Sequence, residues 1–491
     1  MSPSVAIVGG GFGGVGAAAM LHREGYEDVT VFEKADRVGG VWQRNTYPGA
    51  ACDIPSHLYE FSFAPNRWSR RYAPQVEIQA YVENVARHFG VLDKVRTGTE
   101  VTRAEWDEGR RLWRLETSGG PHEAEILVTA CGQLSVPQTP PIPGLADFEG
   151  PAFHTADWDH SVDLAGKRVA VIGTGCSAIQ VVPAIQPRVA QVDVYQRSAG
   201  WTLPKMDFAY SERAKGLLSR PRLRRLDRAA NFLFHEAAAL ALTRRGPLLK
   251  AFGQLGRLQI NKAIEDPELR RRVTPTDEYG CKRIMLTDEW YPTLTEPNVE
   301  LIAERIETVT PGGIRANGVE RPVDAIVLAT GFASHDFVAP MEIVGADGRN
   351  LGEEWAEVPR AYLGSSVPGF PNMFLLYGPN TNGGSGSVVY TLEAGIGHLL
   401  AALRELDRSG ADRIEVRTEA AAAFDRELRA ALAETVWHSG CTSWYVDADG
   451  NDPSQWPWLW SQYRRRTATL EPGAYALDAA EPELVEVGAT P

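Results

Sequence analysis

Three glycines near the start of the chain have the spacing that binds the phosphates of a dinucleotide. Gly9, Gly11 and Gly14 follow the apolar run VAIV and precede the helix-like segment VGAAAMLHREG. Glycines here allow a tight turn and let the backbone approach a pyrophosphate, which then lies at the positive end of the helix. The next strand-like run, 29–32, ends at Glu33, whose carboxylate can accept hydrogen bonds from ribose hydroxyls. These residues predict a dinucleotide-binding site.

A second set of the same kind occurs in RVAVIGTGCSA, where Gly173, Gly175 and Ala178 lie between a strand-like run and a helix-like one. The next strand-like run, QVDVYQR, ends at Arg197, which is followed by Ser198. Arg197 stands at the same interval from its first glycine as the acid of the first site does. An acid at this place suits a free 2′-hydroxyl, whereas a cation suits a 2′-phosphate. The first site is therefore predicted to bind FAD and the second NADPH, unless Arg197 is only a solvated charge at a strand end.

A flavin and a nicotinamide in one chain imply hydride transfer from the nicotinamide into the flavin. The two units predict an α/β protein with two Rossmann-like dinucleotide-binding domains. We expect the FAD-binding domain to comprise 1–150 and 326–491, including a C-terminal tail. The NADPH-binding domain should comprise 151–205 and 273–325, and the helix-like segment 206–272 should be an insert in it.

Two longer motifs accompany the glycine-rich segments. The stretch FEGPAFHTADWD matches the pattern F-x-G-x-x-x-H-x-x-x-W-[P/D] at Phe148, Gly150, His154, Trp158 and Asp159. The stretch GGVWQRNTYPGAACD matches G-G-x-W-x-x-x-x-[FY]-P-G-x-x-x-D, with Trp42 and Asp53 among the matched residues. Both motifs resemble those of type I Baeyer-Villiger monooxygenases, and the resemblance covers most of the chain.

The resemblance implies an enzyme that uses NADPH and O2 to insert one oxygen atom beside a ketone carbonyl, which gives an ester or a lactone. Arg283 resembles the active-site arginine of the family, a permanent cation that can stabilise an anionic peroxyflavin and the negative intermediate that follows. Asp53 resembles the acid that orients this arginine through a charge-assisted pair. Lys282 resembles a second contact to the 2′-phosphate of NADPH, and Trp42 is assigned to the cofactor-binding residues.

The resemblance leaves two aromatic positions and one histidine open. Trp444, in CTSWY, resembles the tryptophan that reaches the nicotinamide ribose, but the segment that follows it departs from the family, so a core role is equally possible. His154 and Trp158 lie on the crossover between the two units. We expect them to fix the relative pose of the domains, because a proton-transfer role for His154 would require it to lie against the flavin.

Composition excludes several other classes of protein. The formal charge of −13 argues against a general nucleic-acid binder. A strand-like run begins at Ser4 and no run of 18 apolar residues occurs, so neither a signal peptide nor a membrane span is expected. The cysteines are scattered without a C-x-x-C pair, which favours reduced thiols in a cytoplasm and supports neither a dithiol nor a metal site. They are Cys52, Cys131, Cys176, Cys281 and Cys441.

The insert differs in charge from the rest of this acidic chain. Lys and Arg outnumber Asp and Glu in 212–272, and runs such as RAANFLFHEAAALAL are amphipathic. Such a segment could form a membrane-surface face. A solvated lid or packing element is the favoured interpretation, so no membrane contact and no protein partner are expected. The acidic tail from Glu471 should wrap over the surface with little order at its end.

Two other functions remain open. A flavin monooxygenase that hydroxylates nitrogen or sulfur would need a protonated hydroperoxide instead of the anion. A flavin reductase or electron carrier would pass its electrons to a protein partner, although such disulfide-linked reductases usually contain a C-x-x-C pair, which is absent here.

Overall fold

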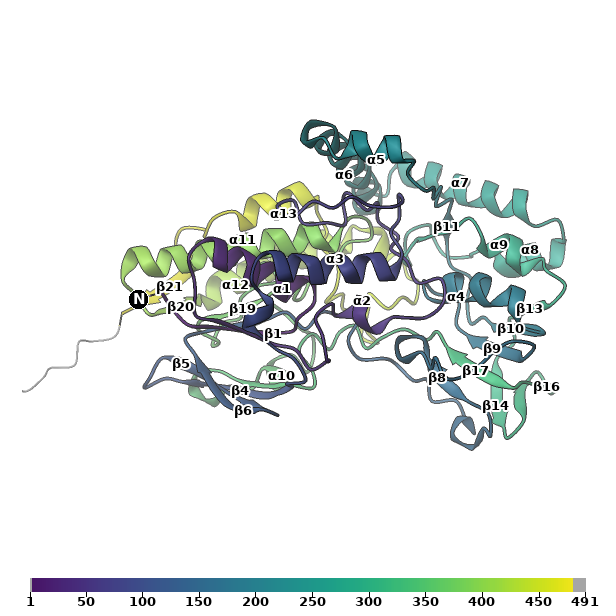
Figure 1. The fold of residues 1–491 in the computed structure, drawn as a ribbon, viewed down its shortest axis with the longest axis horizontal. Coiled ribbons are helices and arrows are strands. Elements are labelled where there is room, and N and C mark those ends of the chain that lie inside the picture. The colour runs from purple at the N-terminus through teal and green to yellow at the C-terminus, as the bar shows by residue number, and fades with distance from the viewer. Residues whose placement is uncertain (1, 480–491) are drawn as a thin grey trace, which may run out of the picture.

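The first glycine-rich turn belongs to a parallel sheet of the order β19-β7-β1-β2-β3 in this computed structural model, which describes residues 2–479 (Figure 1). The strands are β1 (Val5–Val8), β2 (Val29–Phe32), β3 (Val95–Arg96), β7 (Ile126–Thr129) and β19 (Met373–Leu375). Because β7 precedes the second sheet in the chain and β19 follows it, the chain leaves the first sheet and returns to it.

Both faces of this sheet are covered, which explains why its strands are continuous apolar runs. Along β1, Val5 and Ile7 pack against helices, whereas Ala6 and Val8 pack against a second, four-stranded sheet. The helices include α1 (Phe12–Arg23), α3 (Gln75–His88), α11 (Val388–Ser409) and α13 (Trp460–Thr467). The covering sheet consists of β4 (Val101–Asp107), β5 (Leu112–Thr117), β6 (Gly120–Ala124) and β18 (Glu342–Val344).

The second glycine-rich turn belongs to another parallel sheet, with the order β13-β10-β9-β17-β8. Its strands are β8 (Ala152–His154), β9 (Arg168–Ile172), β10 (Gln191–Tyr195), β13 (Val299–Ile302) and β17 (Ala325–Leu328). The helices α4 (Ala178–Ile185) and α9 (Trp290–Leu294) pack on one face. The hairpin strands β14 (Ile306–Thr310), β15 (Gly313–Ala316) and β16 (Val319–Pro322) carry residues that cover the other. The two parallel sheets confirm the α/β class with two Rossmann-like units.

The helical insert leaves and re-enters the second domain at one place. The short strands β11 (Thr202–Leu203) and β12 (Met285–Leu286) pair in parallel on either side of it. Three of its four helices begin with proline at the first helical position, where the missing N–H costs no hydrogen bond. They are α5 (Glu212–Leu218), α6 (Pro221–Arg244), α7 (Pro247–Ala263) and α8 (Pro267–Val273), and α5 to α7 lie along one edge of the molecule (Figure 1).

The end of the second sheet and the tail differ in detail from expectation. The strand β17 pairs with both β8 and β9, so the second sheet extends past residue 325, where we placed a domain boundary. The tail begins with a regular element, because β20 (Arg413–Val416) pairs antiparallel with β21 (Tyr475–Asp478). Residues 480–491, for which we expect little order, lie outside the described residues.

The remaining elements connect these layers. The helices are α2 (Val41–Arg44), α10 (Leu351–Glu354) and α12 (Thr418–Ala433), with the 3-10 helices η1 (Leu92–Lys94), η2 (Leu145–Asp147), η3 (Thr155–Asp157), η4 (Gln186–Arg188), η5 (Ala346–Gly348) and η6 (Val436–His438). Among residues 2–479, no helix has the length and apolar character needed to cross a membrane.

A buried carboxyl between α12 and α13 makes stability depend on pH. Asp452 is 7% exposed, its Oδ1 accepts the amides of Ser454 and Gln455 (2.9 Å each), and its Oδ2 is buried without a partner. Burial, with the charge of Asp447, raises the pKa of Asp452 to about 7 against the opposing effect of the two amides. The folded state therefore holds a proton that the unfolded chain releases near pH 3.8, and stability falls as pH rises between these values.

We expect Asp452→Asn to stabilise the protein at pH 8 by about 4 kcal/mol and to leave it unchanged at pH 4, because the amide keeps the acceptor and never ionises. Thermal unfolding followed by circular dichroism at both pH values measures the difference. The exposed neighbour Asp449, changed to Asn, is the matched control. Equal shifts of the unfolding temperature at both pH values would contradict the ionisation of Asp452 as the cause.

Candidate active site

An ion pair between the two dinucleotide-binding domains brings the predicted catalytic residues together. Arg283 Nη2 donates to Asp53 Oδ2 at 2.6 Å, although the two residues are 230 positions apart in the chain. Asp53 follows α2 in the first domain, and Arg283 lies two residues before β12 in the second. The side chain of Arg283 is 32% exposed and that of Asp53 is 23% exposed, so the pair is partly shielded but still open to a small molecule.

The pair fixes the charge of both side chains. Burial alone would raise the pKa of Asp53, but the charge and hydrogen bond of Arg283, together with Lys205, hold it below its usual value. The carboxylate of Asp53 in turn raises the pKa of Arg283 against the opposing effect of burial. Near neutral pH, Arg283 is therefore a cation and Asp53 an anion.

Three further polar groups surround this pair, and the sequence motifs did not identify them. Cys176 and Tyr445 act electrostatically on Arg283, and the charge of Arg283 also acts on Tyr377. Tyr445 is fully buried and its hydroxyl has no hydrogen-bond partner, whereas the Tyr377 hydroxyl donates to Asn382 (2.9 Å). Two of them could have been identified from the sequence by their positions. Cys176 lies inside the second glycine-rich loop, and Tyr445 follows Trp444.

The structure pairs two of the five cysteines, so the expectation of reduced thiols is wrong for Cys281 and Cys441, which form a disulfide. These residues are 160 positions apart and their Cα atoms are 6.2 Å apart, a proximity that spacing in the sequence cannot reveal. The bond joins the segment of Arg283 to the loop of Trp444. Disulfides are rare in reducing compartments, so the cysteines no longer support the cytoplasmic location, which stays a prediction.

The first glycine-rich turn fits a dinucleotide. Gly9 has φ +108°, and a Cβ atom there would approach the carbonyl oxygen of Ala130 at 2.5 Å. Glu33 is buried, and its carboxylate accepts the backbone amides of Gly10 (2.7 Å) and Ala35 (2.8 Å). These bonds hold Glu33 at the end of β2, where it can accept ribose hydroxyls through its remaining lone pairs. Gly11 and Gly14 lie at the start of α1, and Trp42 Nε1 donates to the hydroxyl of Tyr59 (3.0 Å) in the same domain.

The second turn differs in the groups that surround it. Gly173 has φ +114°. A Cβ atom at Gly175 would meet no other atom within 4 Å, so the backbone just before α4, which begins at Ala178, is open to a ligand. Arg197 and Ser198 are exposed at the end of β10, and Lys282 Nζ donates to Ser198 Oγ (3.1 Å). Lys282 also pairs with Asp277 (2.5 Å), whereas Arg197 has no carboxylate in ion-pair range among residues 2–479.

The residues of the stretch FEGPAFHTADWD make contacts that fix the local structure. His154 ends β8, its Nδ1 accepts the amide of Ala156 (3.0 Å), and its ring packs edge-on against Phe332 (5.6 Å). Burial lowers the pKa of His154, so the ring is neutral. Trp158 packs edge-on against the Phe153 ring (5.0 Å).

The glycine and acid of the same motif shape its backbone. A Cβ at Gly150 would collide with the ring of Phe148 and with the carbonyl oxygen of Asp324. Asp159 Oδ1 accepts the amide (2.9 Å) and the hydroxyl (2.6 Å) of Ser161, which closes a turn. These contacts support a role in positioning, which stays a prediction.

The same segment also touches the first domain. Arg44, in α2, forms a bidentate pair with Asp157 and donates to the carbonyl of Ser135 (2.5 Å), while Thr46 Oγ1 lies 2.8 Å from His160 Nε2. Figure 1 shows α2 between the two domains. Trp444 is 37% exposed and contacts the ring of Tyr445 (4.5 Å), so it is not a core residue.

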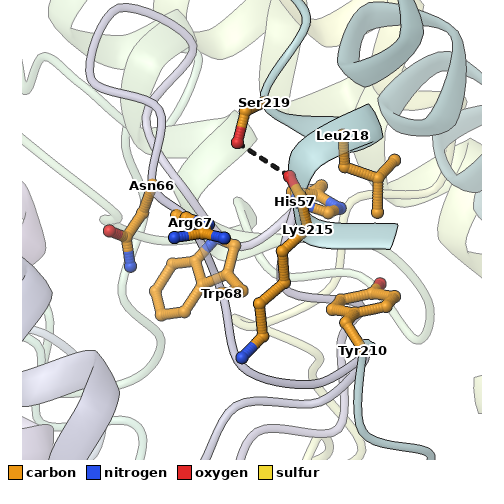
Figure 2. A pocket seen from close by; sticks show the side chains of 8 residues that line it. All are labelled: His57, Asn66, Arg67, Trp68, Tyr210, Lys215, Leu218 and Ser219. Carbon is orange, nitrogen blue, oxygen red and sulfur yellow. Dashed lines mark hydrogen bonds between the residues drawn. The ribbon is translucent and has the colours of Figure 1, made fainter. Parts of the chain in front are cut away.

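A small hollow lies elsewhere, between the loop after α2 and the start of the insert (Figure 2). Its lining residues are His57, Asn66, Arg67, Trp68, Tyr210, Lys215, Leu218 and Ser219. Its two cations, Arg67 and Lys215, both pair with Glu212 at 2.8 Å. The hollow contains no residue of the candidate active site, and we assign no ligand to it. Within residues 2–479, no group of three or more metal-ligating side chains is present.

Known proteins are similar to this chain in sequence and in fold. Residues 6–237 match the family described as pyridine nucleotide-disulphide oxidoreductase. A Baeyer-Villiger monooxygenase of Streptomyces coelicolor is 41% identical over 99% of this chain and 94% of its own length. One from Pseudomonas aeruginosa is 42% identical over 96% of this chain and 91% of its own. The chain belongs to the Baeyer-Villiger monooxygenases.

Solved structures of this family agree with the fold. A steroid monooxygenase bound to NADP is 33% identical, with a TM-score of 0.88 over 98% of this chain and all of that chain. A cyclohexanone monooxygenase from Rhodococcus sp. Phi1, bound to NADP+, is 29% identical, with a TM-score of 0.87 over 97% and 99% of the two chains. OTEMO, in complex with FAD and NADP, is 25% identical, with a TM-score of 0.85 over 97% of this chain and all of its own. This Baeyer-Villiger monooxygenase is therefore an FAD-dependent enzyme that uses NADPH.

The exposed cation at the end of β10 predicts the coenzyme preference. We expect Arg197→Ala to raise the KM for NADPH about tenfold and to leave the KM for NADH unchanged, because only NADPH carries the 2′-phosphate. Steady-state oxidation of both coenzymes measures the effect. Arg188→Ala, which removes another exposed cation of the same domain, is the control. An equal loss with both coenzymes would assign Arg197 a structural role instead.

Proposed function

We propose that this Baeyer-Villiger monooxygenase inserts one oxygen atom of O2 beside the carbonyl of a small ketone, with Arg283 as the residue that stabilises the negative charge on oxygen. The observation that carries the proposal is the ion pair between Arg283 and Asp53, which places a permanent cation between the two dinucleotide-binding domains. A fixed cation in a partly dehydrated site stabilises a developing oxyanion without reorganising.

The cofactors divide the remaining work with the chain. A flavin held in the first domain would supply the redox chemistry, with NADPH as the source of the reducing electrons that activate O2. The first glycine-rich turn and Glu33 would hold the first dinucleotide, and Arg197, Ser198 and Lys282 would hold the 2′-phosphate of the second. Asp53 keeps the guanidinium of Arg283 oriented through a charge-assisted hydrogen bond.

The neighbouring hydroxyl of Tyr445 supports the same chemistry. It is buried, has no hydrogen-bond partner, and its pKa is raised chiefly by burial, so it stays protonated. A neutral phenol beside Arg283 offers a second donor for a carbonyl oxygen, whereas a second cation there would repel the first. The disulfide between Cys281 and Cys441 holds the two segments that carry Arg283 and Tyr445 against each other.

We expect Arg283→Ala to lower the rate of ester formation a hundredfold or more, or on the order of 3 kcal/mol, while anaerobic reduction of the flavin by NADPH continues. The measurement pairs product analysis of a ketone panel under labelled O2 with anaerobic stopped-flow reduction. Arg168→Ala is the control, because it removes an arginine that also pairs with an aspartate, Asp324, but on the surface of the second sheet.

Three outcomes would redirect the proposal. Ester formation at the wild-type rate in Arg283→Ala would remove Arg283 from the reaction. Formation of N-oxides or sulfoxides but no ester by the wild type, from a mixed panel, would select the hydroxylating alternative. Electron transfer to a protein acceptor without oxygen would select the reductase alternative.

A further inference from the structure

The helical insert carries most of the large apolar side chains that this fold leaves exposed. Elsewhere in residues 2–479 such side chains are scattered, as at Val76 and Val319. Those on the two long helices of the insert, which we call the insert surface, are Leu223, Leu226, Leu233, Phe234 and Leu240 of α6 and Leu248, Leu255 and Leu258 of α7. Single exposed apolar side chains are ordinary, but a contiguous set marks a surface that contacts something else.

The spacing of these residues places them on one side of each helix. Intervals of three, four and seven residues recur along both, and the exposed Ala230, Ala237 and Ala251 fall in the same rows. Leu226 and Leu233 are 66% and 65% exposed, and Leu258 is 63% exposed. Phe234 reaches the ring of Phe252 in α7 (6.5 Å), so the two rows form one surface along the edge of the molecule that α6 and α7 occupy (Figure 1).

The opposite side of α6 is already engaged with the rest of the protein. Arg228 donates to the carbonyls of His57 (2.9 Å) and Glu60 (2.8 Å), and Glu236 accepts the amide of Trp460 (2.7 Å). His235 Nδ1 lies 2.8 Å from Ser385 Oγ. These contacts fix the orientation of α6, so a small rotation of the helix cannot bury the apolar row that faces outward.

The exposed charges of α6 and α7 have one sign. Among residues 2–479, none of the exposed cations Arg222, Arg225, Arg244, Lys250 and Lys262 has a carboxylate within ion-pair distance. Many arginines elsewhere are ion-paired, as Arg110 is with Glu123 and Arg168 with Asp324. The acids of α6 are engaged on its other side, where Asp227 contacts His57 and Glu236 accepts the hydroxyl of Ser461.

We propose that α6 and α7 bind the surface of an anionic lipid bilayer through the insert surface. The leucines and Phe234 would enter the boundary between headgroups and acyl chains, and the unpaired cations would contact lipid phosphates. This contact needs no membrane-spanning helix. We prefer this role to the solvated lid or packing element favoured from the sequence, because neither of those accounts for a row of leucines exposed to water.

The charges favour a bilayer over a second copy of this chain. In a twofold contact the insert surface would face itself, which would place unpaired cations opposite unpaired cations. An anionic bilayer instead offers an apolar layer beneath a negative one, which matches both features of the insert surface.

The test is sedimentation of the holoenzyme with vesicles. Vesicles of phosphatidylcholine mixed with phosphatidylglycerol should carry the protein down at low salt, and both high salt and vesicles of phosphatidylcholine alone should weaken binding tenfold or more. The double variant Leu226→Glu with Leu233→Glu should weaken binding by at least tenfold, since it places charge in the apolar row. The matched control, Val76→Glu with Val319→Glu, puts the same charges on exposed apolar positions elsewhere and should bind as the wild type does.

The flavin content and circular dichroism of each variant show whether it is folded. A second double variant, Arg222→Ala with Arg225→Ala, should bind anionic vesicles more weakly and leave binding to neutral vesicles unchanged. Failure of the folded wild type to sediment with anionic vesicles at low salt would overturn the proposal. So would equal losses in the double variant and its control. Concentration-dependent dimerisation without vesicles, abolished by Leu226→Glu with Leu233→Glu, would assign the surface to a second copy.

Discussion

The structure of this enzyme depends on one ion pair that neither domain can form alone. Arg283 belongs to the domain of the second glycine-rich turn and Asp53 to that of the first, and their side chains meet at 2.6 Å. Any displacement of one domain separates the two charges and leaves each partly buried without its partner, which is costly. The pair therefore couples the relative position of the two sheets to the charge of the candidate active site.

Several contacts around the pair limit such a displacement. The hydroxyl of Tyr47 donates to Gln180 of α4 (2.8 Å), and Gln180 Nε2 donates to the carbonyl of Ala51 (2.9 Å). Gly49 has φ +84°, and a Cβ there would lie 2.5 Å from the carbonyl oxygen of Gln180. The close approach of the two domains therefore explains Gly49 in the stretch GGVWQRNTYPGAACD. The same approach places Asp53 beside Arg283.

How far the sequence predicted this arrangement depends on the range of each interaction. The glycine-rich turns and the contrast between Glu33 and Arg197 are local, so spacing alone indicated two dinucleotide sites. Arg283 and Asp53 were found through the family resemblance, not through proximity. The Cys281–Cys441 bond and the unpaired hydroxyl of Tyr445 depend on folding between distant segments, and no pattern in the sequence encodes that distance. The exposure of the leucines in α6 was equally hidden, because amphipathic spacing is the same for a buried row and an exposed one.

The net charge of the chain predicts repulsion from an anionic bilayer, whereas the cations of α6 and α7 predict attraction. A formal charge of −13 should repel the bilayer, but screening limits this effect to about 8 Å at physiological salt. Charges that lie more than a few screening lengths from the surface act on it weakly, and the exposed cations of α6 and α7 would lie nearest to it. At contact, the unpaired cations and exposed leucines dominate. The sign of the whole chain therefore decides its solubility, and the local arrangement of charge decides what it can touch.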